Sequence, residues 1–318
     1  MLNSIIKLLM NKEVMNMDLL VVGSINMDYI CYMDALPNPG ETVRADEFKR
    51  LSGGKGANQA VAAAKSAIAV QMIGCVGDDG IGELMKNNLF SSGVDTNIIY
   101  ILEETPSGMA FINVNKDGEN NIVILPGANA KVSNKLLDEN LEAFKATKAV
   151  LLQHEIPLET VDYALKLAKQ FNKITILNPA PAYPLKDETL KLTDILILNE
   201  HELSIASNMH TDTIEKTDTA ANLLISKGVK RVIVTLGSKG LIDYFENEKY
   251  VHSSFKVNAV DSTAAGDTFI GAFCAEFLNG ANRQDCIDYA QKAAALSVTK
   301  KGAQESIPTK EQIESAVF

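Results

Sequence analysis

The sequence has no tryptophan, few histidines and cysteines, and no excess of basic residues among its 318 positions. The four cysteines, Cys31, Cys75, Cys274 and Cys286, show no C-x-x-C spacing, and none has a nearby histidine that would complete a zinc site. We therefore expect buried free thiols in a reducing, cytoplasmic compartment. The formal net charge of −10 argues against nucleic acid or an anionic membrane as a partner, because both require a basic face.

The N-terminus lacks the features of a targeting or membrane segment. Its apolar run at residues 5–10 is interrupted by Lys7, and no small-residue cleavage site follows it. We interpret residues 1–16 as an extension that is either disordered or not translated, with translation starting at Met15 or Met17. Residues 17–318 are sufficient for one large domain.

Two nucleotide-binding signatures are also missing. The first apolar run ends at Gly23 and continues as Ser24-Ile25-Asn26, without the G-x-G-x-x-G of a dinucleotide-binding turn, which argues against a nicotinamide dehydrogenase. The glycine-rich stretch at residues 52–59 lacks the G-x-x-x-x-G-K-[ST] spacing of a Walker A loop. If the chain binds a nucleotide, it does so with other groups.

The chain does show a regular alternation of apolar strands and amphipathic helices. Residues 18–23 form a continuous apolar run, which is typical of a strand buried on both faces of a parallel sheet. We predict further strands at 149–153, 174–177, 195–198 and 231–235, with helices at 158–171, 200–206 and 217–227 between them. The predicted fold class is α/β, with a central, mostly parallel sheet flanked by helices.

Two pairs of strands do not fit this alternation. Residues 29–33 and 42–51 form the first pair, and residues 108–115 and 119–125 form the second, around the hairpin turn Lys116-Asp117-Gly118. We predict a small β-sheet from about 28–51 and 107–125 that acts as a lid over the site. The alternative is that these strands extend the main sheet.

Polar residues follow the ends of the predicted strands, where open α/β sheets bind ligands. They are Ser24, Asn26 and Asp28, then Glu155, then Asn178, then Asn199 with Glu202, and finally the segment 235–240. Asn199 and Glu202 are three positions apart at a helix start, so they either order waters on Mg²⁺ or cap the helix. For the cluster after the first strand, the alternative is a turn stabilised by its own side chains.

The glycine-rich stretch suits a polyol better than a triphosphate. Its glycines, Gly53, Gly54 and Gly56, permit close backbone approach, while Lys55 and Asn58 supply hydrogen bonds.

Residues 261–269 connect the strand-like run 255–260 to an apolar helix. Ala264, Ala265 and Gly266 leave backbone N–H groups accessible at a helix N-terminus, which favours an anion. Asp267, in the first turn, is placed to accept a proton from a hydroxyl that attacks this anion. The pattern indicates phosphoryl transfer to an alcohol. The alternative is that Asp267 caps the helix and Gly266 forms a turn.

Taken together, these motifs resemble the ribokinase-like family of carbohydrate kinases. The resemblance runs from about Met17 to the C-terminus, and its anchors are residues 23–28, 39–42, 53–59, 178–181, 199–202, 264–269 and 301–304. It implies phosphorylation of a pentose by ATP at its primary hydroxyl, D-ribose giving D-ribose 5-phosphate. It also implies a homodimer that pairs through the lid.

The resemblance assigns roles to individual residues. The catalytic group is Asp267 as general base, with an anion hole at Ala264, Ala265 and Gly266. The sugar-binding residues are Asn26, Asp28, Gly54, Lys55, Asn58, Glu155 and Asp267. The ATP-binding residues are Asn199, Thr235, Gly237, Ser238, Gly240, Gly266 and Gln291. Glu202 holds Mg²⁺ through water, and Asp261, Thr263, Ser297, Gly302 and Ser306 hold K⁺.

Two alternatives to a pentose kinase remain open. The first is a kinase of the same family that acts on another sugar or on a nucleoside. The second is a non-catalytic sugar or nucleotide sensor on the same scaffold, which would have no need of a base such as Asp267.

Overall fold

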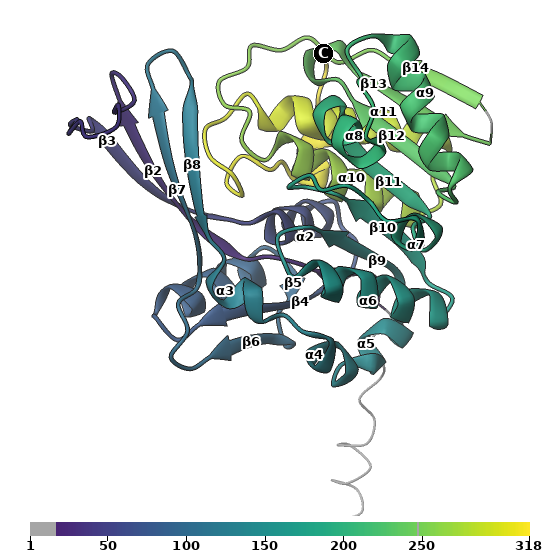
Figure 1. Cartoon of the computed structure of the whole chain (residues 1–318), viewed down its shortest axis with the longest axis horizontal. Helices are drawn as coiled ribbons and strands as arrows, with labels where there is room; N and C mark the ends of the chain where they lie inside the picture. Colours follow the sequence, from purple (N-terminus) through teal and green to yellow (C-terminus); the bar gives the residue numbers. More distant parts are fainter. Residues whose placement is uncertain (1–16, 247) are drawn as a thin grey trace, which may run out of the picture.

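The computed structural model describes residues 17–246 and 248–318. Its centre is a ten-stranded sheet (Figure 1). The path runs β14 (Glu248–His252), β13 (Leu241–Phe245), β12 (Arg231–Thr235), β11 (Ile195–Asn199), β10 (Ile174–Asn178), β9 (Thr147–Gln153), β1 (Met17–Val22), β4 (Val70–Gly77), β5 (Val94–Asp95), and β6 (Ile99–Leu102) also pairs with β4. The pairs β12–β13 and β13–β14 are antiparallel and the others are parallel. The predicted fold class is therefore confirmed.

Helices cover both faces of this sheet. On one face, α2 (Lys55–Lys65), α3 (Ile81–Ser91), α10 (Ala265–Leu278), α11 (Arg283–Ser297) and α12 (Lys310–Ser315) share a core with alternate strand residues such as Leu19 and Val21. On the other face, Leu20 and Val22 pack with α4 (Asn134–Asp138), α5 (Leu141–Ala146), α6 (Leu158–Gln170), α7 (Asp187–Lys191), α8 (Glu200–Ser207) and α9 (Ile214–Ser226). Because β1 is covered on both faces, its sequence is an unbroken apolar run.

A separate four-stranded sheet projects from this body (Figure 1). Its order is β3 (Glu47–Gly53), β2 (Asn26–Met33), β7 (Gly108–Asn115) and β8 (Asn120–Leu125). β2 and β7 pair in parallel, and this parallel pair joins the two predicted strand pairs into one sheet. The strands do not extend the main sheet, so that alternative is wrong.

Two predicted strands differ from the structure. Residues 255–260 form no strand, although their sequence alternates in polarity, because no neighbouring strand pairs with them; Phe255, Lys256, Val257 and Ala259 line a cavity instead. The strand predicted from residue 42 begins only at Glu47, since residues 41–45 are loop.

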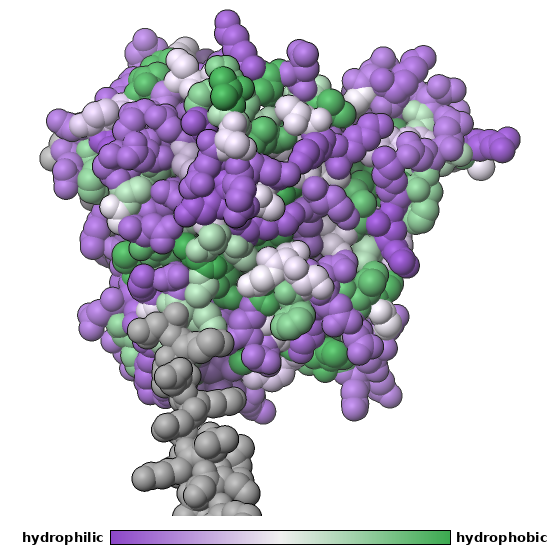
Figure 2. Space-filling model, turned by 180° about the vertical axis from the view of Figure 1, so that it is seen from behind, coloured by the Kyte–Doolittle hydropathy of each residue, from purple (hydrophilic) through white to green (hydrophobic). Residues whose placement is uncertain are grey.

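The surface seen from behind is mostly hydrophilic, with apolar residues in small separate groups (Figure 2). Within the part of the chain that the structure describes, no helix combines the length and apolar character needed to cross a bilayer. The predictions for residues 1–16 lie outside the described residues.

Candidate active site

Two adjoining cavities lie at the carboxyl ends of the central strands. The smaller one, of about 260 Å³, is lined by residues from β10, β11 and α8 and by the first turn of α10. The larger one, of about 530 Å³, extends over residues 235–241 and 254–259 to α11. Thr235, Ser262, Ala265 and Gly266 line both cavities. The start of α10 is therefore the place where a ligand in one cavity meets a ligand in the other.

The start of α10 presents unpaired backbone donors to these cavities. Ala264, the N-cap residue, has a left-handed conformation with φ 58, and its carbonyl accepts the Thr268 N–H at 2.8 Å. The Ala265 N–H donates to the Ser262 carbonyl at 3.2 Å. The N–H groups of Gly266 and Asp267 have no acceptor within the described part of the chain. With the helix dipole, these donors favour a negatively charged group.

The Asp267 carboxylate is held by one donor on each oxygen. Asn58 Nδ2 donates to Oδ2 at 3.0 Å, and Gln59 Nε2 donates to Oδ1 at 2.9 Å. Both donors lie on α2, beside α10. Asp267 is 8% exposed and faces the smaller cavity, so its carboxylate is oriented yet accessible to a ligand.

The polar residues after β1 lie against the glycine-rich loop. A Cβ at Gly53 would lie 2.2 Å from Asp28 Oδ2, and one at Gly54 would lie 2.7 Å from the Asn26 nitrogen. Gly54 also has φ +89, a conformation that only glycine adopts readily. The glycines therefore let this loop pack directly on the strand that carries Asn26 and Asp28.

Several carboxylates surround the Lys55 ammonium. Burial alone would lower the pKa of Lys55, but the negative charges of Asp267, Glu155, Glu202 and Asp28 raise it above its ordinary value. Glu155 is fixed by the Lys55 backbone N–H at 3.0 Å and by the Ser24 hydroxyl at 2.6 Å. Lys55 is therefore a firmly charged group at the centre of the predicted sugar site.

Asp28 titrates near neutral pH. Burial raises the pKa of Asp28 to about 7, the charges of Glu155, Asp267 and Glu305 add to this shift, and Lys55 opposes it. A ligand hydroxyl that donates to Asp28 would favour its charged form.

The residues predicted to bind ATP lie along the two cavities. Thr235, Gly237, Ser238, Gly240, Gly266 and Gln291 line the larger cavity, whose walls are mostly apolar, and Asn199 lines the smaller one with Glu202. Asn199 and Glu202 form a reciprocal capping box at the start of α8. Burial raises the pKa of Glu202, opposed by the Asn199 N–H and by Lys55. The pair thus caps the helix and also faces the cavity.

Three of the residues predicted to bind K⁺, Asp261, Thr263 and Gly302, are joined by hydrogen bonds at the loop that leads into α10. Asp261 Oδ1 accepts the Thr263 N–H at 2.9 Å, and Oδ2 accepts the Gly302 N–H at 3.0 Å. Ser297 and Ser306 lie within five positions of Gly302 in the sequence, and both are buried. Their hydroxyls donate to the carbonyl oxygens of Ala294 and Ala303. Asp261 therefore ties the loop before α10 to the segment after α11.

Comparison with known proteins places this site in a family. Residues 16–310 match the pfkB family carbohydrate kinase profile. The chain belongs to the pfkB family of carbohydrate kinases. It is 40% identical over 298 residues to a ribokinase from Haemophilus influenzae, covering 94% of this chain and 97% of the relative. It is also 40% identical to a deoxyribokinase from Salmonella typhi, covering 93% and 97%.

The fold of this pfkB family kinase is shared with solved structures. An Arabidopsis thaliana ribokinase complexed with ribose and ATP superimposes with a TM-score of 0.88, at 36% identity, covering 94% of this chain and 98% of that chain. The family resemblance and the prediction of a carbohydrate kinase are confirmed. The residue roles and the metal ions stay predictions.

Sequence reasoning assigned no role to three side chains that organise the pfkB family site. Gln59 contacts Asp267, and Gln153 contacts Gln59. Asn129 donates to Asn26 Oδ1 at 2.7 Å and to the Ile25 carbonyl at 3.1 Å. The position of Gln59 directly after Asn58 was a usable signal, whereas nothing near Asn129 in the sequence indicates its long-range contact.

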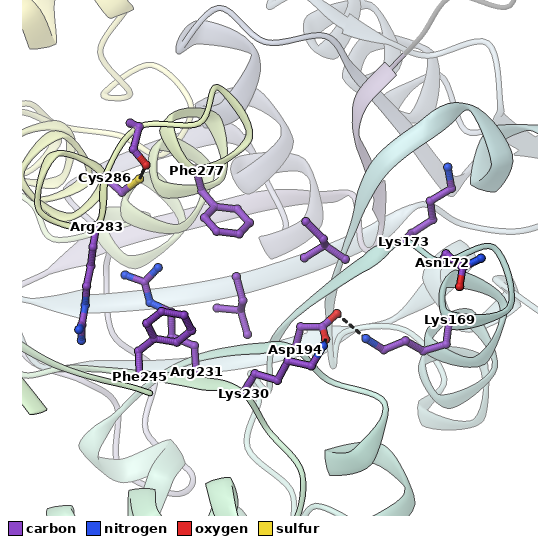
Figure 3. Close-up of a pocket in the computed structure, with 13 residues that line it drawn as sticks. Lys169, Asn172, Lys173, Asp194, Lys230, Arg231, Phe245, Phe277, Arg283 and Cys286 are labelled. Atoms are coloured by element: carbon purple, nitrogen blue, oxygen red, sulfur yellow. Dashed lines mark hydrogen bonds and ion pairs between the residues drawn. The ribbon is translucent and has the colours of Figure 1, made fainter. Parts of the chain in front are cut away.

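A further cavity, of about 600 Å³, lies at the amino ends of the central strands, away from the two adjoining cavities (Figure 3). Most of its charged side chains are in ion pairs. Asp194 pairs with Lys169 and Lys230, and Asp243 pairs with Arg231 and Arg283. None of the predicted site residues lines this cavity. The predicted site residues therefore lie at the other end of the central strands, around the two adjoining cavities.

Proposed function

We propose that the protein transfers the γ-phosphoryl group of ATP to the primary 5-hydroxyl of D-ribose and forms D-ribose 5-phosphate. The observation that carries this proposal is the position of Asp267, which lies beside the free N–H groups at the start of α10, where the two cavities meet. The names of the relatives support the substrate, since several ribokinases are 37–40% identical to the chain.

The residues suggest a division of labour. Asp267 accepts the hydroxyl proton while the phosphoryl group transfers in line. The anion hole was predicted at Ala264, Ala265 and Gly266, but the Ala265 N–H is already bonded to the Ser262 carbonyl. In this proposal the N–H groups of Gly266 and Asp267 and the helix dipole therefore stabilise the charge that develops on the phosphoryl oxygens. Asn26, Asp28, Lys55 and Asn58 hold the sugar hydroxyls so that the reacting oxygen faces the phosphate.

The two cavities suit different parts of the reacting complex. The larger, mostly apolar cavity fits the adenine and ribose of ATP, with Gln291 at one wall and Gly237 and Ser238 at another. The smaller, more polar cavity fits the phosphates and the reacting hydroxyl. ATP would therefore cross from one to the other over Gly266.

The residues present fit a magnesium ion and a monovalent cation. Glu202 lines the phosphate cavity and would hold Mg²⁺ through water, as part of a sparse set of protein ligands typical of this ion. Mg²⁺ would neutralise charge on the phosphates. Asp261, Thr263 and the Gly302 segment supply oxygen ligands for K⁺ directly behind the anion-binding loop.

A second candidate substrate is 2-deoxy-D-ribose. The deoxyribokinase from Salmonella typhi is as similar to the chain, at 40% identity, as the Haemophilus influenzae ribokinase. The two sugars differ in a single hydroxyl, so the family match does not separate them. Kinases of the same family that act on other sugars or nucleosides are the remaining alternatives.

A substrate panel tests the proposal. ADP release is measured with D-ribose, 2-deoxy-D-ribose, D-fructose and adenosine at matched concentrations. We expect the highest kcat/KM with D-ribose and phosphate on its 5-oxygen by NMR. A clear preference for one of the other three would assign the chain to that substrate, and binding without turnover of any would favour the sensor.

We also propose a homodimer that pairs through the projecting sheet. β8 is an edge strand with all six residues exposed, and it carries Ile122 and Val123 at 52% and 66% exposure. An exposed apolar edge favours pairing with another strand. We expect a dimeric mass by light scattering and a monomeric one for Ile122→Lys; a monomeric wild type would contradict the proposal.

We assign the protein to the cytoplasm, where ATP is available and thiols stay reduced. All four cysteines are free, which supports this assignment. Fractionation of cells with an antibody against the chain checks it, and recovery outside the cytoplasmic fraction would contradict it.

A further inference from the structure

A chain of three buried amides leads from β9 to Asp267. Gln153, at the end of β9, donates from Nε2 to Gln59 Oε1 at 2.7 Å. Gln59 Nε2 donates both to Asp267 Oδ1 at 2.9 Å and to Asn178 Oδ1 at 3.1 Å. Gln153 and Gln59 are 0% exposed, and Asn178 is 5% exposed. These polar side chains are buried beside the reacting group, although apolar residues would fill the same space.

The direction of the Gln59 amide is determined by Asn178. The Asn178 amide nitrogen donates to the Ile197 carbonyl at 3.0 Å, which leaves its oxygen for Gln59. The Gln59 nitrogen therefore points toward Asn178 and Asp267, and the Gln59 oxygen accepts from Gln153, whose own Oε1 has no partner among the described residues. A flipped Gln59 amide would place its oxygen against both the Asp267 carboxylate and the Asn178 oxygen. The network therefore always presents a donor to Asp267.

Gln59 acts on Asp267 without contact to a ligand. Asp267 lines the smaller cavity, whereas Gln59 lines neither of the two adjoining cavities. The backbone there is also tightly packed, because a Cβ at Gly271 would lie 2.5 Å from the Gln59 carbonyl oxygen. The spacing between α2 and α10 at this point is thus set by Gly271.

We propose that Gln59 is a positioning residue for phosphoryl transfer, which holds Asp267 Oδ1 so that Oδ2 faces the sugar hydroxyl, with Asn178 fixing the direction of its amide. This inference rests on the proposed role of Asp267 as the base. Donors on both oxygens fix the rotation of the carboxylate, Gln59 on Oδ1 and Asn58 on Oδ2. Loss of Gln59 leaves the Asn58 contact alone, so the carboxylate is less firmly oriented and has lost one hydrogen bond to its charged form.

Other charges act on Asp267 and stay in place when Gln59 is changed. Lys55 from α2, Asp28 from β2 and Glu202 from α8 interact electrostatically with the site. A change in the pH profile that follows substitution of Gln59 alone is therefore attributable to the lost hydrogen bond.

The test uses Gln59→Met, which keeps the length of the side chain and removes both polar atoms. We expect kcat to fall about 10-fold to 100-fold, the size of a misplaced catalytic group, with KM for sugar and ATP changed less than about threefold. The acidic limb of the kcat profile should move to higher pH. Wild-type kcat and pH profile in a variant that binds D-ribose normally by calorimetry would overturn the proposal.

Gln71→Met is the matched control. Gln71 Nε2 donates to Asp95 Oδ2 at 2.7 Å, the same kind of glutamine–aspartate contact, on β4 and β5 away from the site. We expect it to leave kcat and the pH profile unchanged. An equal loss in both variants would mean that Gln59 acts through stability alone, and would overturn the proposal.

Two further variants separate this inference from the proposed function. If Gln59→Met does not fold, Gln59→Glu preserves the shape, and we expect a loss of kcat that deepens from pH 6 to pH 9; wild-type activity throughout would overturn the proposal. The double variant with Asp267→Asn should be no slower than Asp267→Asn alone. If Asp267→Asn remains active, the base assignment itself fails; if it is inactive while Gln59→Met is normal, only the positioning role fails.

Discussion

Asn58 and Asp267 are 209 positions apart in the sequence, yet Asn58 Nδ2 donates to Asp267 Oδ2 at 3.0 Å. Asn58 belongs to the glycine-rich motif that the family resemblance assigns to the sugar, and Asp267 to the motif assigned to the phosphate. One hydrogen bond therefore joins the predicted sugar-binding motif on α2 to the predicted phosphate-binding motif on α10.

Two glycines on α10 give opposite predictions. A Cβ at Gly266 meets nothing within 4 Å of the protein, whereas a Cβ at Gly271 would lie 2.5 Å from Ala62 Cβ. Gly266→Ala should leave stability within about 1 kcal/mol but lower kcat/KM for ATP about 10²-fold by occupying the anion site. Gly271→Ala should instead destabilise the fold by about 1–3 kcal/mol.

Urea unfolding and steady-state kinetics of the two variants check this pair of predictions. Normal kcat/KM for ATP in Gly266→Ala would contradict the placement of the anion site at the start of α10.

Asp28→Asn should stabilise the protein at high pH while it weakens sugar binding. Burial raises the pKa of Asp28 from its ordinary 3.8 to about 7, so the folded state holds a proton that the unfolded state releases. The stability contributed by protonated Asp28 is complete below pH 4 and is lost as pH rises through 7. This loss is on the order of 4 kcal/mol.

The neutral asparagine does not incur this loss, so the difference in unfolding free energy between Asp28→Asn and wild type should grow from pH 4 to pH 8. Denaturant titrations across this range measure it. A difference that is independent of pH would contradict the interpretation.

Asp261→Asn should weaken activation by potassium. The Asp261 carboxylate carries the negative charge of the proposed cation site and accepts N–H donors from Thr263 and Gly302. We expect half-maximal activation to require about 10-fold more K⁺, with tetramethylammonium as the control for ionic strength. Unchanged activation would move the cation site elsewhere.

Asp243→Asn should reduce stability without changing catalysis. Asp243 is 0% exposed and pairs with Arg231 at 2.7 Å and with Arg283 at 2.6 Å. Both arginines line the cavity at the amino ends of the central strands, away from the proposed active site. Its loss leaves two arginines without their shared partner, which costs about 3–5 kcal/mol. Chemical denaturation measures this loss of stability. An altered kcat in the folded variant would contradict the prediction that this ion-pair cluster does not affect the active site.

The parts of the fold that follow from local pattern could be predicted from the sequence. The apolar run before Gly23 and the small residues before Asp267 each indicated their element, because burial on both faces and backbone access leave marks within a few positions. The strand predicted at residues 255–260 was wrong because alternation in polarity also occurs in a segment that lines a cavity.

Contacts between distant segments left no such mark. The role of Asn129, which is 103 positions from Asn26, depends on how β2 meets the 3₁₀ helix Gly127–Lys131 that follows β8. The chain from Gln153 through Gln59 depends on the packing of α2 against α10 and β9. No spacing rule relates these positions, so only the assembled fold brings them together.

The measurement that tests the central claim most directly is the turnover of Asp267→Asn with D-ribose and ATP. The substitution keeps the shape of the side chain and removes its ability to accept the proton. We predict that kcat falls by ~10² to 10⁴ while the affinity for D-ribose, measured by calorimetry, changes only a few-fold. Turnover close to that of the wild type would contradict the assignment of Asp267 as the base.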